Sequence, residues 1–234
     1  MPRKPWGGTI PAERESYEAK RRAALETAAR AFNERGFYKT SLDDIAAELH
    51  VTKAALYYYF ESKDEILYEC HAVAIRSLTD TPLEGVYDRA LTGLEKIERL
   101  LRRYAAMIVQ SFGRCLVLVG TQPLERHNAA KCRAGRRAIN DLLVGLIRDG
   151  IADGSVAPCD PKLAAYFIFG SLNWIAQWYR DDGRQTLDQV TDQLIGYVLG
   201  GIATPTARAQ RTAAAKRDVN TRRSRLRAAR SPSR

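Results

Sequence analysis

The sequence predicts an all-α protein with a three-helix N-terminal helix-turn-helix domain and a larger C-terminal helical bundle, with about nine helices in total. Apolar residues recur at the spacing of amphipathic helices through most of the chain, and no segment alternates convincingly as a β-strand would. Capping residues and glycine or proline stops divide this pattern into segments of ordinary helix length. These observations favour helices packed on helices over any fold with a sheet.

Four helices are expected in the N-terminal part of the chain. The first ends at Gly36, and Ser41 caps the second. A third helix follows Val51, and Ser62 with Glu65 forms a capping box that begins the fourth. The inward residues of the first helix, at i, i+3, i+4 and i+7, are Leu25, Ala28, Ala29 and Phe32.

Five more helices are expected downstream, near residues 83–112, 115–119, 124–149, 162–179 and 187–199. Asp160 and Pro161 supply a cap and a first-turn proline, and Thr186 with Gln189 makes another capping box. The predicted organisation is a disordered arm (1–15), a helix-turn-helix domain (16–78), a second helical domain (79–204) and a basic disordered tail (205–234).

The positive charge of the chain is concentrated at its C-terminus. Residues 205–234 contain ten Lys or Arg and one acidic residue, and so carry +9 of the formal net charge of +10. The basic pI is therefore a property of the tail, and an argument for a nucleic-acid partner has to rest on particular residues elsewhere. The tail itself either adds sequence-independent phosphate contacts or remains solvated.

Several classes of protein are not supported by the sequence. The cysteines have no C-x-x-C spacing, so we expect reduced thiols without a metal site, and we expect no cofactor. No nucleophile elbow, phosphate-binding loop or zinc-protease motif is present, so we do not expect an enzyme. The N-terminus lacks the apolar core of a signal peptide, and the most apolar stretch is too short and polar to span a membrane, which predicts a cytoplasmic protein.

Residues 40–60 carry the strongest functional signal. They predict two short helices around a tight turn, with an apolar core shared with Phe32. The expected core residues are Ile45, Leu49, Val51, Leu56 and Phe60. On the third helix, Ala54, Tyr57 and Tyr58 lie on the arc opposite Leu56.

This exposed arc predicts a surface that reads DNA. A small Ala54 permits close approach to base edges, Lys53 can reach a guanine or a phosphate, and tyrosine hydroxyls donate to phosphate oxygens. Lys63, and Thr40 or Ser41, begin helices where a phosphate could also be held. The alternative is that a tyrosine triplet at helical spacing serves packing, and this applies most to Tyr59, which lies towards the apolar arc.

The motif resembles the DNA-binding domain of the tetracycline-repressor (TetR) family over about residues 18–70. The matching elements are Gly36-Phe37, Thr40-Ser41, Asp44-Ile45-Ala46, Val51-Thr52-Lys53, Leu56-Tyr57-Tyr58-Tyr59-Phe60 and Ser62-Lys63-Asp64-Glu65. The resemblance implies that Thr52 and Lys53 lie near bases, and that the phosphate contacts come mainly from Thr40, Tyr57, Tyr58, Tyr59 and Lys63.

The sequence departs from the family pattern at three positions, which are His50, Ala54 and Tyr59. His50 stands where a turn glycine is usual, and His tolerates the left-handed conformation better than most residues, at a cost of about 1 kcal/mol. Ala54 stands where glycine is common. Tyr59 replaces a frequent histidine, which bears on the preferred operator.

The segment FGSLNWIAQWYRDDG (169–183) predicts a homodimer contact and resembles a subgroup of the same family. Gly170, Ser171 and Ala176 would let two helices approach closely across a two-fold axis. The effectors of the subgroup are often acyl-CoA thioesters, which implies an apolar cavity and arginines near the nucleotide phosphates. The candidate ligand residues are Arg133, Arg136, Arg137, Trp174, Trp178 and Arg180. The alternative is that the tryptophans form the interface core and the arginines a solvated face.

Together these features predict a homodimeric bacterial repressor that binds a palindromic operator in double-stranded DNA. A small hydrophobic or acyl-CoA-type effector would release it from the operator, because a ligand that prefers a conformation with misplaced DNA-binding domains lowers DNA affinity. The competing hypothesis is a helical adaptor or nucleoid-type protein that binds DNA nonspecifically through its basic tail.

Overall fold

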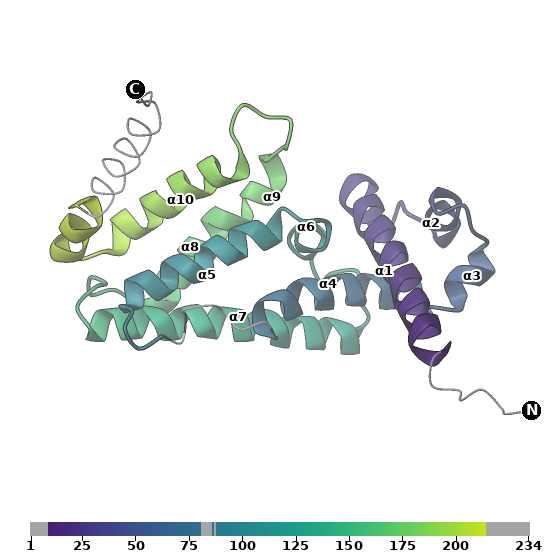
Figure 1. Cartoon of the computed structure of the whole chain (residues 1–234), viewed down its shortest axis with the longest axis horizontal. Coiled ribbons are helices and arrows are strands. Elements are labelled where there is room, and N and C mark those ends of the chain that lie inside the picture. The colour runs from purple at the N-terminus through teal and green to yellow at the C-terminus, as the bar shows by residue number, and fades with distance from the viewer. Residues whose placement is uncertain (1–8, 81–85, 87, 214–234) are drawn as a thin grey trace, which may run out of the picture. The chain divides into compact units, whose positions relative to one another are not determined.

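The protein is all-helical, as predicted. A computed structural model describes residues 9–80, 86 and 88–213, and these ranges contain the helices α1–α10, a further helical segment at residues 205–213 and one isolated β-bridge, between Val156 and Ala203 (Figure 1). The helices are α1 (Thr9–Arg35), α2 (Leu42–Glu48), α3 (Lys53–Tyr57), α4 (Lys63–Thr79), α5 (Gly93–Ile108), α6 (Ser111–Leu118), α7 (Arg126–Ala152), α8 (Pro161–Asn173), α9 (Ile175–Trp178) and α10 (Leu187–Ile202).

Several element bounds differ from those expected. Helix α1 begins at Thr9, inside the segment expected as a disordered arm, and residues 1–8 lie outside the described ranges. The helix expected over 83–112 begins only at Gly93, because Thr92 and Glu95 form a capping box at this point. The helix expected over 162–179 is divided at Trp174 into α8 and α9.

The beginning of the expected basic tail is also helical. Residues 205–213 form a helix, and the guanidinium of Arg211 pairs with Glu98 of α5. Residues 214–234, the remainder of the expected tail, lie outside the described part of the chain.

The chain divides into two compact units. The first unit takes residues 1–82, 103–141 and 169–187, and the second takes 83–102, 142–168 and 188–234. The first unit therefore contains α1–α4, α6 and α9, together with the end of α5 from Arg103, the first part of α7 and the end of α8 from Phe169. The expected domain boundary near residue 78 does not coincide with this division and stays a prediction.

The core of the first unit holds the helix-turn-helix together. Phe32, Ile45, Leu56 and Phe60 are buried, as expected from their spacing. Val51 is 43% exposed, so its expected place in the core is wrong. Its N–H donates to the carbonyl of Ala46 at 3.0 Å, which fixes the turn, while the side chain faces outward. Leu49 is half-buried.

The second unit is closed by charged and backbone contacts between distant segments. Glu98 accepts hydrogen bonds from Arg102 and Arg211, and Arg102 also pairs with Asp192 of α10. Burial raises the pKa of Glu98, but the hydrogen bonds from Arg211 and Arg102 lower it by more, so the net pKa lies below its usual value.

No described helix is long and apolar enough to cross a membrane.

The turn between α2 and α3 depends on a left-handed residue that is not glycine. His50 has φ +55°, as expected from its place in the motif, and its N–H donates to Ala47. A β-branched side chain is strained in this conformation, whereas glycine adopts it without a Cβ clash. The conformation of this one residue therefore sets the geometry of the turn.

We expect His50→Val to lower the free energy of unfolding by about 1–2 kcal/mol, because valine strongly resists a positive φ. His50→Gly should leave it unchanged or slightly higher, since relief of strain is offset by the larger entropy of the unfolded chain. Urea denaturation of the three proteins measures the order. A valine variant as stable as the parent would contradict the assigned turn.

Candidate nucleic-acid interface

The two short helices of the motif begin with side-chain caps. Ser41 precedes α2 and forms a capping box, since its hydroxyl accepts from the Asp44 N–H at 3.1 Å and its own N–H donates to Asp44 Oδ2 at 2.7 Å. The Ser41 hydroxyl also donates to Asp44 Oδ2 at 2.7 Å, and this bond, followed by the one from the Ser41 N–H, lowers the pKa of Asp44. Thr52 caps α3, and its Oγ1 accepts from the Ala55 N–H at 3.3 Å. Short helices need such caps, because few of their bonds are internal.

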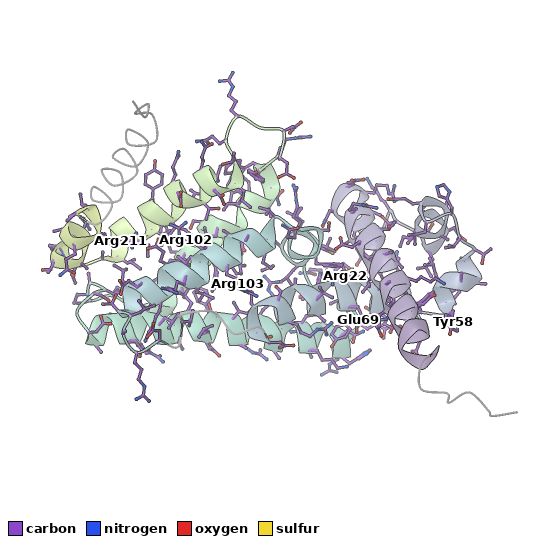
Figure 2. The ribbon with its side chains drawn as sticks, in the orientation of Figure 1. Arg22, Tyr58, Glu69, Arg102, Arg103 and Arg211 are labelled. Carbon is purple, nitrogen blue, oxygen red and sulfur yellow. The ribbon has the colours of Figure 1, made fainter. Side chains whose placement is uncertain are left out.

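Helix α3 presents a continuous outward face. Leu56 is 2% exposed, whereas Tyr57 is 52% and Tyr58 72% exposed. Ala54 is also exposed, on the same side as the tyrosines. Figure 2 shows Tyr58 projecting from α3. The structure thus confirms the two-sided character of this helix, with one face in the core and one face open.

Lys53, the first residue of α3, is exposed and paired within the motif. Its Nζ donates to Asp43 Oδ2 of α2 at 2.8 Å, and this hydrogen bond raises the pKa of Lys53. An exposed pair of this kind is weak in water. The ammonium can therefore exchange Asp43 for a phosphate or base oxygen at small cost.

Thr40 and Lys63 point into the protein, unlike the other polar residues of the motif. Thr40 is 1% exposed, and its hydroxyl donates to the carbonyl of Gly36 at 2.9 Å. The Lys63 ammonium donates to the carbonyls of Phe37 and Thr40, both at 3.0 Å, and lies 4.2 Å from the Phe37 ring centroid. Burial lowers the pKa of Lys63. Both side chains are engaged by backbone carbonyls of the motif, and the phosphate contacts expected for them stay a prediction.

An aromatic cluster links α1 to the residues around the end of α3. The Tyr17 ring lies 4.9 Å from the ring of Tyr59 and 5.8 Å from that of Tyr58, between centroids. Tyr59 is half-buried in this cluster, as its position towards the apolar arc suggested. The sequence does not predict the contact of Tyr17 with Tyr58 and Tyr59, because these residues lie about forty positions apart in the chain.

The residues expected to bind the effector lie at the surface of the first unit. Arg133, Arg136 and Arg137 are exposed on α7, and Arg180 pairs only with its neighbour Asp182. Trp174 is 64% and Trp178 45% exposed. The structure therefore does not enclose these residues within the first unit.

A separate cavity of about 350 Å³ lies within the first unit. Its wall is mostly apolar and includes two arginines, Arg22 of α1 and Arg103 of α5, which Figure 2 labels. Arg103 donates two hydrogen bonds to the carbonyl of Ser77, at 2.8 and 3.2 Å. The residues that line it are Arg22, Glu26, Val73, Ala74, Ser77, Arg103, Ala106, Met107, Gln110, Phe112 and Gly113. None of the six expected ligand residues is among them.

Within the described ranges, no group of His, Cys, Asp and Glu side chains is arranged to hold a metal ion. The four cysteines are free thiols, of which Cys159 is exposed and the other three are buried.

Comparison with known proteins identifies the family. Residues 24–70 match the family model for bacterial regulatory proteins of the tetR family, and residues 90–202 match the tetracyclin repressor-like C-terminal domain. The crystal structure of PfmR, a TetR family transcriptional regulator from Thermus thermophilus, is similar to this one, with a TM-score of 0.68 and 31% sequence identity. The matched region covers 75% of this chain and 96% of the PfmR chain. The chain belongs to the TetR family. It is a transcriptional regulator with a DNA-binding domain and a ligand-binding domain.

Two further similar proteins are a repressor and a regulator that was solved with its ligand and DNA. The HTH-type transcriptional repressor KstR2 of Rhodococcus jostii is 29% identical over 206 residues, which are 83% of this chain and 97% of that protein. The structure of AibR in complex with isovaleryl coenzyme A and operator DNA is also similar, with a TM-score of 0.68 and 28% sequence identity. The matched region covers 76% of this chain and 96% of the AibR chain.

The inward position of Lys63 predicts a structural role for this TetR-motif lysine. We expect Lys63→Met to lower the free energy of unfolding by about 1–3 kcal/mol, because two backbone carbonyls lose a charged donor. Lys53→Met is the matched control, since Lys53 carries the same side chain in an exposed pair, and it should leave the denaturation midpoint unchanged. Equal midpoints for the two variants would contradict the assignment.

Proposed function

We propose that this regulator is a homodimeric repressor that binds a palindromic operator in double-stranded DNA and leaves it when a small hydrophobic or acyl-CoA-type effector binds. The observation that carries the proposal is the outward face of α3, with exposed Thr52, Lys53, Ala54, Tyr57 and Tyr58 above a buried Leu56. A polar and aromatic face on a short, capped helix after a tight turn has the form of a recognition helix. Such a repressor acts in the cytoplasm, on the bacterial nucleoid.

Each outward residue has a chemical task in this proposal. Ala54 lets the helix approach the base edges, and Thr52 and Lys53 offer a hydroxyl and an ammonium to bases or nearby phosphates. The hydroxyls of Tyr57 and Tyr58 donate to phosphate oxygens, and exposed Ser41 at the start of α2 is placed for the same contact. Thr40, Tyr59 and Lys63 support this surface from inside the motif rather than contact DNA.

The homodimer is supported by apolar residues that the second unit leaves uncovered. On α8, Leu163, Tyr166 and Phe167 are 67%, 64% and 66% exposed, and on α10 Tyr197 is 73% exposed. Large exposed apolar patches mark interaction surfaces. Beside Tyr197, a Cβ at Gly196 would meet no atom, which leaves room for a close helix–helix approach. A two-fold dimer also presents two recognition helices to successive major grooves, about 34 Å apart.

An acyl-CoA effector is supported by two observations. AibR, which has the same fold at 28% identity, was solved with isovaleryl coenzyme A and operator DNA. The cavity of the first unit is mostly apolar with arginines in its wall, which suits an acyl group next to an anion. The surface residues Arg133, Arg136, Arg137, Trp174, Trp178 and Arg180 remain candidates for the nucleotide part of such a ligand, because a coenzyme is too large for the cavity alone.

Release would follow from linkage between the two ligands. An effector lowers operator affinity only by the difference between its affinities for the DNA-competent and DNA-incompetent conformations. A coupling of about 1–3 kcal/mol weakens operator binding by roughly 5- to 150-fold.

A footprint on the DNA upstream of the protein's own gene tests the proposal. We expect protection of a palindrome by the parent protein and none by Ala54→Glu, because a larger, negative side chain is brought against the base edges and phosphates. Ala134→Glu, at an exposed position of α7, is the matched control and should protect the same palindrome.

The same footprint, repeated with a panel of acyl-CoA thioesters, tests the effector. Loss of protection with one thioester supports the ligand class, and protection unaffected by every thioester removes it while keeping the repressor. The absence of any specific footprint at low salt would favour a nonspecific adaptor or nucleoid-type protein.

We expect Phe167→Glu together with Tyr197→Glu to convert the dimer into a monomer, because two charges would be buried at the interface without partners. Light scattering after size exclusion measures the molar mass. Tyr38→Glu is the control, since Tyr38 is a 78% exposed aromatic residue outside this surface. A parent protein that is already monomeric would rule out the dimer.

A further inference from the structure

The first turn of α4 makes polar contacts in two directions. Lys63 donates to the carbonyls of Phe37 and Thr40, in the segment between α1 and α2. The next residue, Asp64, is only 9% exposed, although a carboxylate is costly to bury. An unusual burial of this kind requires compensation by specific donors.

The compensation comes from the beginning of α7. Asp64 Oδ1 accepts from the backbone N–H of Glu125, the residue before α7, at 2.6 Å. Asp64 Oδ2 accepts from Asn128 Nδ2, in the first turn of α7, also at 2.6 Å. Asn128 is itself 6% exposed. Both bonds are short, and both have a carboxylate acceptor, which makes them stronger and more directional than bonds to a neutral carbonyl.

The location of the carboxylate is electrostatically favourable. It belongs to the first turn of α4 and faces the first turn of α7, so it meets the positive ends of two helix dipoles. A neutral side chain of similar size would not gain this interaction. The contact therefore holds the start of α7 to the start of α4 in one relative position, whereas apolar packing alone tolerates small shifts.

Lys63 links the first turn of α4 to the segment that precedes α2. The carbonyl of Thr40, which Lys63 holds, immediately precedes Ser41, the cap of α2. Helix α3 follows α2 across the turn at His50, whose N–H donates to Ala47, and the exposed pair of Asp43 and Lys53 adds only a weak contact. A displacement of the first turn of α4 thus displaces the segment that leads into α2, and α3 follows through the turn.

We infer that Asp64 is a positioning residue, through which the start of α7 sets the position of the DNA-reading helices. Asp64, Glu125 and Asn128 form a latch that is closed in this structure and holds α2 and α3 in place. A ligand that moves the start of α7 opens the latch and frees the reading helices. This inference rests on the proposed function, because it names the contact through which an effector lowers operator affinity.

An exchange of the two partners tests the latch. Asn128→Asp places a second carboxylate against Asp64, and we expect operator affinity to fall by about tenfold or more, because like charges at this distance repel. The double variant Asp64→Asn with Asn128→Asp restores one amide, one carboxylate and a donor–acceptor pair. We expect its operator affinity to return to within about threefold of the parent. Fluorescence anisotropy with the full chain and the footprinted palindrome measures both.

A loss of affinity caused by lower stability is separated by a matched variant. Tyr104→Phe removes another hydrogen bond of the first unit, from Tyr104 Oη to Asn173 Oδ1 at 2.6 Å, without touching the first turn of α4. It should lower the melting temperature and leave operator affinity unchanged. Parent-like affinity of Asn128→Asp, failure of the double variant to recover, or an equal loss in Tyr104→Phe would each overturn the inference.

Hydrogen exchange without DNA distinguishes failure of the latch from failure of the proposed function. In Asn128→Asp, the amides of α2 and α3 should exchange faster than in the parent, and the double variant should restore their protection. If no specific operator exists but exchange responds in this way, the repressor proposal fails and the latch stands. If exchange in α2 and α3 does not respond to Asn128→Asp, the latch is refuted whatever DNA the protein binds.

Discussion

The outward face of α3 depends on the hydrogen bonds that the Lys63 ammonium donates to the carbonyls of Phe37 and Thr40. Helix α3 has only five residues and α2 only seven, and helices of this length are unstable alone because nucleation costs more than so few bonds return. Their caps and the buried residues Ile45 and Leu56 keep them helical, but neither feature fixes where α2 begins. Lys63 of α4 fixes the start of α2, because its ammonium donates hydrogen bonds to carbonyl oxygens that lie between α1 and α2. The outward face of α3 is therefore a consequence of an inward contact some residues away.

The polar residues of the motif divide into two groups by this logic. Thr52 and Lys53 lie at the start of a helix with solvent on one side, so their polar atoms are available to a second molecule. Thr40 and Lys63 lie where the chain turns between helices, and there the backbone groups left without partners recruit them. Both groups have the composition expected of DNA contacts, and a family resemblance alone assigns them the same role. Burial distinguishes Thr40, whose hydroxyl is 1% exposed and already donates to Gly36, whereas half-buried Lys63 is distinguished by its hydrogen bonds to the carbonyls of Phe37 and Thr40.

The sequence could predict what local rules determine. Helical spacing and caps predicted the all-α class and the order of the helices, because each depends on neighbours within about four residues. The left-handed His50 followed instead from the resemblance to the family pattern, in which a turn glycine is usual. The same rules did not predict the start of α5, which the capping box of Thr92 and Glu95 sets. They also placed Val51 in the core, although the turn directs its side chain outward. They could not assemble the cavity, since its wall joins Arg22 to Arg103 across eighty positions of chain. They also could not show that Asp64 is buried, because its donors follow α6.

The strength of the latch agrees with what a regulator requires. A hydrogen bond to a charged group contributes about 1.5–3 kcal/mol, so the loss of one of the two bonds of Asp64 is comparable with a typical allosteric coupling of about 1–3 kcal/mol. A much stronger contact would hold the reading helices against any effector of ordinary affinity, since a ligand shifts an equilibrium only by its differential binding energy. A much weaker one would leave those helices free without effector, and operator affinity would be low in both states. With two charged hydrogen bonds at the start of α4, a modest displacement of α7 that breaks one of them is sufficient to change DNA binding.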